Sequence, residues 1–210
     1  IGTAKTPALI DVRTDEDFAA DQRLIPGAVR RNHEDAAGWG EEFSGRSAIV
    51  VCLRGQKIAQ GTAAWLRHLH VSAEALEGGF EGWKEAKLPL VNAAKLPPRD
   101  AQGRTVWVTR ARPKVDRIAC PWLIRRFVDP AARFLFVAPS EVRGVVERFG
   151  ATPFDIEGED VFWSHRGERC TFDVMIEEFG LATPPLLRLA TMVRGADTGR
   201  PDLCPEAPGL

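Results

Sequence analysis

One stretch in the first half of the chain restricts the fold more than any other. Residues 47–52, SAIVVC, are β-branched and almost wholly apolar, as expected of a strand covered on both faces. A short glycine-containing loop, LRGQK, follows at 53–57 and leads into a helical pattern over 58–71. A buried strand that passes through a tight loop into a helix predicts a parallel sheet with crossover connections. The residues expected on the inner face of that helix are Ile58, Ala59, Ala63, Leu66 and Leu69 or His70.

The rest of the first half repeats this alternation. The pattern predicts a strand at 8–12, a helix over 15–22, a strand and turn at 73–79 and a short helix at 80–87. Residues 92–104 contain two prolines and little apolar content, which is typical of a linker. We therefore expect an α/β domain over 1–91, with helices flanking its sheet, and a second domain over 105–210.

Helices prevail in the second half, where we expect a smaller α+β domain. The predicted elements are a strand at 105–109, a helix through 121–128, a strand at 133–137, a helix over 140–150, a strand pair around 154–156 and 161–165, and helices over 171–180 and 184–195.

Charge and cysteine content exclude several classes of protein. The formal net charge is -1, so no strong field attracts the chain to nucleic acid or to a membrane surface. No apolar run approaches the roughly 20 residues that a transmembrane helix needs. The four cysteines lie far apart with no CxxC pair, which argues against a disulfide framework and favours a cytoplasmic location. The chain opens at Ile1 without a methionine, which is also compatible with a leader that has been removed.

Cys52 is the strongest candidate nucleophile. It stands between a buried strand and a helix, where loop amides and the helix N-terminus stabilise an anion and lower the pKa of a thiol. Such a thiolate can accept a sulfur atom and carry it as a persulfide. The alternative is a buried structural cysteine. The residues expected to cradle an anionic substrate are Leu53, Arg54, Gly55, Gln56 and Lys57.

The first half resembles the rhodanese family. The matching segments are Leu9–Arg13, Asp17-Phe18, Ile25–Ala28, the Cys52 loop, and Gly78–Phe80 with Trp83, which together span nearly all of residues 1–98. The resemblance implies a sulfurtransferase that needs no cofactor, with a small anionic sulfur donor and a thiol acceptor. It also implies that Asp11 and Arg13 belong to the catalytic centre as a strand-end pair that braces it. The family usually has Arg directly after the cysteine, whereas this chain has Leu53 there. The resemblance therefore does not identify the sulfur donor.

Polar and charged residues are dense over 112–126. Asp116 and Cys120 share a face if they lie on one helix, but Pro121 is comfortable only in a first helical turn. We therefore expect the helix to begin at Pro121, after a turn formed by residues 116–120. The residues of this stretch that we consider as ligands of an anion or a metal are Arg112, Asp116, Arg117 and Cys120.

A second dense stretch begins just before the helix predicted over 171–180. Phe172, Met175, Ile176 and Phe179 have the spacing of a core stripe. The polar residues off this stripe suit a transition metal or, with the arginines, an oxyanion, although an ordinary solvated helix face would look similar. The metal candidates are His165, Cys170, Asp173 and Glu177, and the further anion candidates are Arg166, Arg194 and Asp197.

Residues 105–210 resemble the C-terminal domain of the chromate-resistance protein family. The matching motifs are RPKVDRIACPWLIRRF, Phe162 with Ser164–Asp173, and VRGADT ending at Thr198. The resemblance implies a role with chromate, which is an oxyanion shaped like sulfate. We expect a persulfide-carrying sulfurtransferase linked to chromate, oxyanion or metal stress. The alternative is a chromate- or metal-sensing protein with a vestigial rhodanese domain. A DNA-binding regulator fits less well, because the charge is balanced and no helix-turn-helix signature is present.

Overall fold

The computed structural model describes residues 6–158 and 161–209. The chain ends considered above, Ile1 and Leu210, lie outside these residues. Two compact units are present: one reaches to Ala94 and includes Arg126–Val128, and the other contains Lys95–Arg125 and the residues from Asp129 onward. None of the helices in the described ranges has the length and apolar character that a membrane crossing requires.

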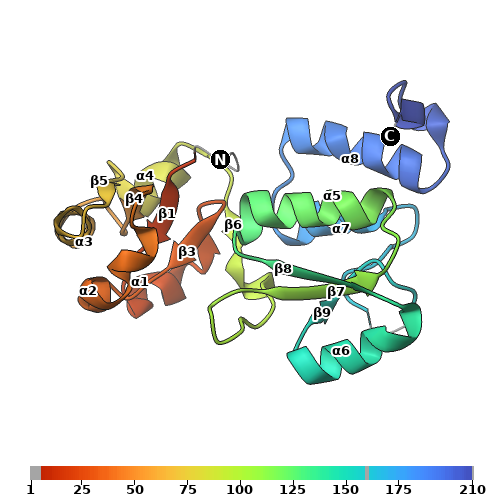
Figure 1. Cartoon of the computed structure of the whole chain (residues 1–210). Coiled ribbons are helices and arrows are strands. Elements are labelled where there is room, and N and C mark those ends of the chain that lie inside the picture. The colour runs from red at the N-terminus through yellow and green to blue at the C-terminus, as the bar shows by residue number, and fades with distance from the viewer. Residues whose placement is uncertain (1–5, 159–160, 210) are drawn as a thin grey trace. The chain divides into compact units, whose positions relative to one another are not determined.

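A four-stranded parallel sheet forms the centre of the first unit, in the order β3-β1-β4-β5 (Figure 1). A small antiparallel pair, β2 with β6, completes it. The strands are β1 Ala8–Asp11, β2 Arg23–Leu24, β3 Ala28–Arg30, β4 Ser47–Val51, β5 Ser72–Ala75 and β6 Val91–Asn92. The helices are α1 Asp15–Ala20, α2 Ala36–Trp39, α3 Lys57–His68 and α4 Gly79–Glu85.

The core of this unit lies between the sheet and α3. Ala59, Ala63 and Leu66 are fully buried, as predicted for the inner face of the helix, whereas Ile58 and Leu69 are partly buried and His70 is exposed. The helix ends at His68, earlier than its pattern suggested, because His70 adopts a left-handed φ of 60°. The segment expected to be a linker, 92–104, begins inside β6 and contains a bridge between Arg99 and Thr105.

The second unit has a three-stranded parallel sheet in the order β8-β7-β9. Figure 1 shows α5 and α7 on one face of this sheet, α6 on the other face, and α8 stacked outside α5 and α7. The strands are β7 Val106–Arg110, β8 Arg133–Val137 and β9 Thr152–Pro153, and the helices are α5 Val115–Leu123, α6 Val142–Phe149, α7 Thr171–Glu178 and α8 Pro184–Asp197. The predicted core stripe of α7 is confirmed, since Phe172, Met175, Ile176 and Phe179 are all buried.

Two local expectations in this unit are wrong. Helix α5 begins at Val115 rather than at Pro121, so the proline lies inside it and the chain continues as a π-helical turn at Ile124–Val128. Long-range contacts hold the early turn, because the Asp116 N–H donates to Asp197 Oδ1 at 3.3 Å. The strand pair expected around 154–156 and 161–165 is a single parallel bridge between Phe154 and Trp163.

Candidate functional site

Cys52 directly follows β4 at the carboxyl edge of the first sheet. Its neighbour Val51 is in register with Asp11, the last residue of β1. The carboxyl edge of a parallel sheet is where α/β folds place their ligands. Cys52 is 5% exposed and belongs to the hydrophobic core of the unit, so bulk solvent reaches very little of it.

Helix α4 fixes the orientation of the peptides that follow Cys52. The N–H of Phe80 donates to the carbonyl of Cys52 at 2.9 Å, and that of Glu81 donates to the carbonyl of Leu53 at 3.0 Å. In a trans peptide the N–H points opposite to the carbonyl, so the amides of Leu53 and Arg54 are directed away from α4. Within residues 6–158 and 161–209, the amides of 53–56 donate no hydrogen bond, which leaves them available to an anion.

Two glycines allow the cysteine loop and the start of α4 to touch. Gly55 and Gly79 have φ values of 68° and 59°, in the left-handed region. A Cβ on Gly79 would lie 2.4 Å from the carbonyl oxygen of Cys52 and 2.4 Å from the nitrogen of Gly55. The backbones meet so closely that no larger residue fits without moving the loop.

Asp11 and Arg13 brace the site from the end of β1. The Arg13 guanidinium donates to Asp11 Oδ2 at 2.7 and 2.9 Å and to the backbone carbonyls of Asp21 and Arg23. It also stacks over the ring of Phe80 at 3.8 Å, and Phe80 is the residue whose amide holds the Cys52 carbonyl. Arg13 is 2% exposed and all three guanidinium nitrogens donate hydrogen bonds, so it braces the backbone around the end of β1.

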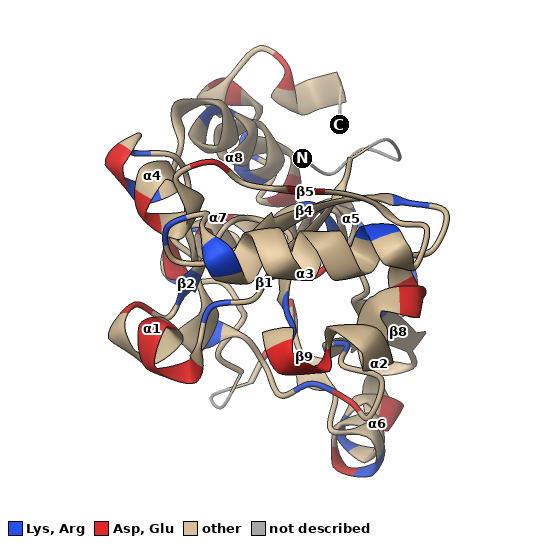
Figure 2. Cartoon of the chain, turned by 90° about the vertical axis from the view of Figure 1, so that its left-hand side faces the viewer, with Lys and Arg blue, Asp and Glu red and all other residues tan. Residues whose placement is uncertain are grey.

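The polar side chains of the cysteine loop are exposed, unlike the buried side chain of Arg13. Arg54, Gln56 and Lys57 are exposed, and among the described residues none of them has a hydrogen-bond or ion-pair partner. Lys57 begins α3, whose two strongly basic residues, Lys57 and Arg67, stand near its ends (Figure 2). The positive charge of the cysteine loop is therefore carried by the exposed side chains of Arg54 and Lys57.

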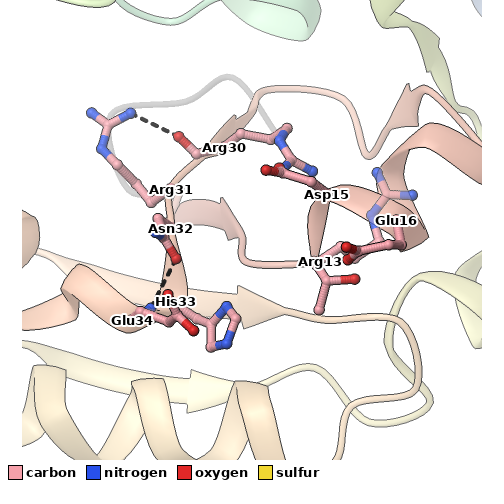
Figure 3. A pocket seen from close by; sticks show the side chains of 9 residues that line it. Arg13, Asp15, Glu16, Arg30, Arg31, Asn32, His33 and Glu34 are labelled. Atoms are coloured by element: carbon pink, nitrogen blue, oxygen red, sulfur yellow. Dashed lines mark hydrogen bonds and ion pairs between the residues drawn. The ribbon is translucent and has the colours of Figure 1, made fainter.

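A separate pocket of about 470 Å³ opens beyond the ends of β1 and β3 (Figure 3). Its arginines are already paired: Arg13 with Asp11, Arg30 with Asp15 at 2.6 Å, and Arg31 with Glu42 at 2.7 Å. Of these guanidinium groups, Arg30 also has a buried Nη1 with no hydrogen-bond partner among the residues that the structure describes. The lining residues are Arg13, Thr14, Asp15, Glu16, Arg30, Arg31, Asn32, His33 and Glu34.

The second unit gathers three aspartates around one histidine. His165 Nε2 lies 3.5 Å from Asp116 Oδ2, 3.3 Å from Asp155 Oδ1 and 3.3 Å from Asp197 Oδ2. Asp116 comes from the first turn of α5, Asp155 follows β9 and Asp197 ends α8. Asp116 is fully buried and its Oδ2 accepts the N–H of Thr171 at the start of α7 at 2.5 Å.

Burial and mutual charge shift the pKa values of His165, Asp116 and Asp155. The carboxylates of Asp116, Asp155 and Asp197 raise the pKa of His165 to about 12. Burial raises the pKa of Asp116, and the negative charges of the two other aspartates add to that effect. Burial also acts to raise the pKa of Asp155, but stabilisation of its carboxylate by His165 and by the Thr171 hydroxyl outweighs it and leaves that pKa below its ordinary value.

The cluster forms part of an open pocket of about 400 Å³. Arg117, on α5, contributes Nε at 3.1 Å from Asp155 Oδ2. Arg110, the last residue of β7, has a buried Nε with no hydrogen-bond partner in the described ranges. The lining residues are Arg110, Lys114, Arg117, Asp155, Ile156, Glu157, Ser164, His165 and Asp197.

Comparison with protein families finds a matching family for each half of the chain. Residues 2–86 match the rhodanese-like domain, and residues 107–210 match the C-terminal domain of ChrB. The chain joins a rhodanese-like domain to a ChrB C-terminal domain. Both resemblances inferred from the motifs are thereby confirmed, as is the α/β fold followed by a helix-rich α+β fold.

One relative and several solved structures illustrate these matches. Protein ChrB of Cupriavidus metallidurans is 41% identical over 111 residues, which are 51% of this chain and 32% of that protein, so the chain spans about a third of its relative. A rhodanese-like domain protein from Staphylococcus aureus is 26% identical with a TM-score of 0.34, covering 38% of this chain and 76% of that one. A rhodanese-related protein from Thermoplasma volcanium is 19% identical with a TM-score of 0.37, covering 41% and 85%.

The ChrB C-terminal domain assembles some of the predicted residues and separates others. Asp116, Arg117, His165 and Asp197 meet in the cluster. Cys120 and Cys170 are buried nearby, and burial raises the pKa of both thiols, so neither is a ready thiolate.

The remaining candidates have other partners or none. Asp173 accepts the N–H of Cys170 at 3.1 Å and a bond from Arg194 at 2.8 Å. Glu177 pairs with Arg169 on the surface, and Arg166 pairs with Glu178 at 2.5 Å. Asp173 and Glu177 therefore do not join His165, contrary to the predicted set of metal ligands. Arg112 is exposed in a left-handed turn and lies outside the pocket lining.

Sequence reasoning missed Asp155. A signal was present, because Asp155 lies near the carboxyl end of a strand of a parallel sheet, as Asp11 does in the rhodanese-like domain. Its φ of 50° turns the chain at that point.

Proposed function

We propose that this protein is a sulfurtransferase that carries sulfane sulfur as a persulfide on Cys52. The observation that carries the proposal is the set of unpaired loop amides after Cys52, which α4 turns away from itself by holding the carbonyls of Cys52 and Leu53. Amides that converge in such a loop stabilise negative charge on a sulfur or on a departing anion.

The transfer proceeds in two displacements. The Cys52 thiolate attacks the outer sulfur of an anionic donor such as thiosulfate, the sulfur–sulfur bond of the donor breaks, and sulfite leaves with the bonding electron pair. A thiolate or cyanide acceptor then attacks the outer sulfur of the persulfide and restores the thiolate of Cys52. The loop amides and the exposed cations Arg54 and Lys57 favour the anionic donor and sulfite.

The low exposure of Cys52 sets the size of the donor. With 5% of the residue exposed, a compact donor reaches the sulfur more readily than a bulky ester. Leu53 places an apolar side chain where the rhodanese family usually has a cation, so we expect weaker binding of highly charged donors.

Activity and persulfide formation are measured on matched cysteine variants. We expect thiosulfate:cyanide activity, and a 32 Da mass increase on Cys52 after treatment with thiosulfate, in the wild-type chain. Cys52→Ser removes both, whereas Cys204→Ser, which changes a partly exposed thiol in the other domain, retains them. Equal activity in Cys52→Ser and the wild type would refute the proposal.

A second candidate function is binding of chromate or a similar oxyanion by the ChrB C-terminal domain. The pocket beside His165 favours it, since Arg110, Lys114 and Arg117 line that pocket and the Nε of Arg110 is buried without a partner. Guanidinium groups suit oxyanions. Calorimetric titration with chromate and sulfate, repeated on Arg110→Ala, tests this function, and absence of binding to the wild type would exclude it.

A further inference from the structure

We propose that the ChrB C-terminal domain binds a divalent transition-metal cation between Asp116, His165 and Asp197. Within the described residues, one ligand atom from each of these three lies within 4.8 Å of the others. They come from α5, from the segment before α7 and from the end of α8, so the tertiary fold creates the site.

The distances within the cluster suit ligands of one metal ion better than groups that hydrogen-bond to each other. His165 Nε2 lies 3.3 to 3.5 Å from the carboxylate oxygens of Asp116, Asp155 and Asp197. Good N–H···O bonds measure roughly 2.7–3.2 Å, so all three contacts are long. In a tetrahedral shell with metal–ligand bonds of about 2.0–2.2 Å, neighbouring ligand atoms lie about 3.3–3.6 Å apart. Among the proposed ligands, the separations from His165 Nε2 to Asp116 Oδ2 and to Asp197 Oδ2, 3.5 and 3.3 Å, lie in this range.

Asp116 supplies a second, independent observation. Its side chain is fully buried, yet Oδ1 accepts no hydrogen bond from any residue that the structure describes. An unpaired carboxylate oxygen away from water is costly unless a cation or a donor compensates it. The other oxygen is fixed by the N–H of Thr171, which holds the carboxylate in place facing His165.

Asp155 lies beside the three proposed ligands but has protein partners of its own. Its Oδ1 accepts the Thr171 hydroxyl at 3.0 Å, and its Oδ2 pairs with Arg117 Nε at 3.1 Å. Both oxygens are therefore engaged without a metal, which sets Asp155 apart from Asp116. The three ligands leave a fourth position, and His165 and Asp197 line the pocket of about 400 Å³ described above. That position is therefore open to water or to a small anion.

The donor set selects the class of cation. One imidazole nitrogen with carboxylate oxygens suits Zn²⁺, Mn²⁺ or Fe²⁺, whereas Mg²⁺ and Ca²⁺ prefer oxygen ligands alone.

The test is metal binding to the full chain after treatment with a chelator. Zn²⁺ is titrated by calorimetry and Mn²⁺ by loss of its free-ion EPR signal, on the wild type and on His165→Ala and Asp197→Asn. His165 is 41% exposed at its side chain, so its replacement removes no fully buried side chain. Glu177→Gln is the matched control, since Glu177 is a carboxylate of the same region that pairs with Arg169 at the surface.

We expect one ion per chain in the wild type and in Glu177→Gln, with affinity at least about 10-fold weaker in His165→Ala and Asp197→Asn. Circular dichroism verifies that each variant is folded, and His165→Ala alone decides the result if Asp197→Asn does not fold. Absence of binding to the wild type would overturn the proposal and leave His165 as the protonated centre of an ion-pair cluster. Unchanged binding in His165→Ala would overturn it equally, because the ion would then lie elsewhere.

Discussion

Replacing Gly79 by alanine is expected to disrupt the cysteine loop through its backbone. Gly79 has a φ of 59°, and an added Cβ would lie 2.4 Å from both the Cys52 carbonyl oxygen and the Gly55 nitrogen. Non-bonded heavy atoms are comfortable at roughly 3.5–4.0 Å, so the loop and α4 must separate by about 1 Å. This separation breaks the bonds from Phe80 and Glu81 that orient the loop peptides.

The magnitude follows from two contributions. A left-handed conformation costs an L-residue roughly 1–2 kcal/mol, and each lost hydrogen bond costs about 1 kcal/mol. Gly79→Ala should therefore destabilise the rhodanese-like domain by about 3–4 kcal/mol. Gly45 is the matched control, because its φ is 74° and no atom lies within 4 Å of an added Cβ. Gly45→Ala should cost roughly 1–2 kcal/mol, from backbone strain alone.

Urea unfolding followed by circular dichroism gives the free energy of each variant. Hydrogen exchange on peptides from residues 47–85 shows whether the loss falls on the cysteine loop and α4. Thiosulfate:cyanide activity should fall in Gly79→Ala and persist in Gly45→Ala. If the two variants lose the same stability and exchange alike around Cys52, the close approach of the two backbones does not hold the loop, and the reasoning is wrong.

Two further predictions concern the ChrB C-terminal domain. Asp129→Asn should destabilise the protein by about 2–3 kcal/mol in urea unfolding. The buried Oδ2 of Asp129 accepts both the N–H and the hydroxyl of Thr105 at 2.7 Å, and an amide nitrogen at that place cannot accept them. An unchanged midpoint of the urea transition would contradict this prediction. Hydrogen bonds from Arg166 and then Lys95 hold the pKa of Glu178 below its ordinary 4.5. The ionised Glu178 therefore stabilises the folded protein fully above pH 4.5, and this stabilisation is lost as the pH falls through the lowered pKa. Glu178→Gln should therefore lower stability by about 0.5–1 kcal/mol at pH 7 and by progressively less below pH 4.5, and a difference independent of pH would argue against the ion pairs.

Sequence patterns predicted most of the rhodanese-like domain, because the residues within each helix or strand are enough to indicate its type. The run that ends at Cys52 is a strand because its β-branched residues are buried on both faces of a parallel sheet. The inner face of α3 follows directly from its helical spacing. The burial of Arg13 is different, since it depends on carbonyls of Asp21 and Arg23 and on the ring of Phe80, which local patterns do not relate to each other.

The cluster around His165 could be predicted only in part for the same reason. Asp116, Asp155 and Asp197 come from separate elements, and their meeting with His165 is a property of the tertiary fold. Spacing along one helix instead grouped Cys170, Asp173 and Glu177, of which the last two form separate ion pairs. The rule that proline starts a helix also misplaced α5, because contacts from Asp197 and from α7 fix the turn before Pro121.

The groups that hold the shape of the Cys52 loop differ from the side chains that the loop exposes, and this has an evolutionary consequence. Backbone bonds from α4 and the buried Arg13 hold the shape of the loop, while the side chains of Arg54 and Gln56 make no contact on which that shape depends. Natural selection can therefore exchange these side chains at little cost to the scaffold. Diversity among descendants of this domain should concentrate at those two positions, with Gly79 and Arg13 held constant.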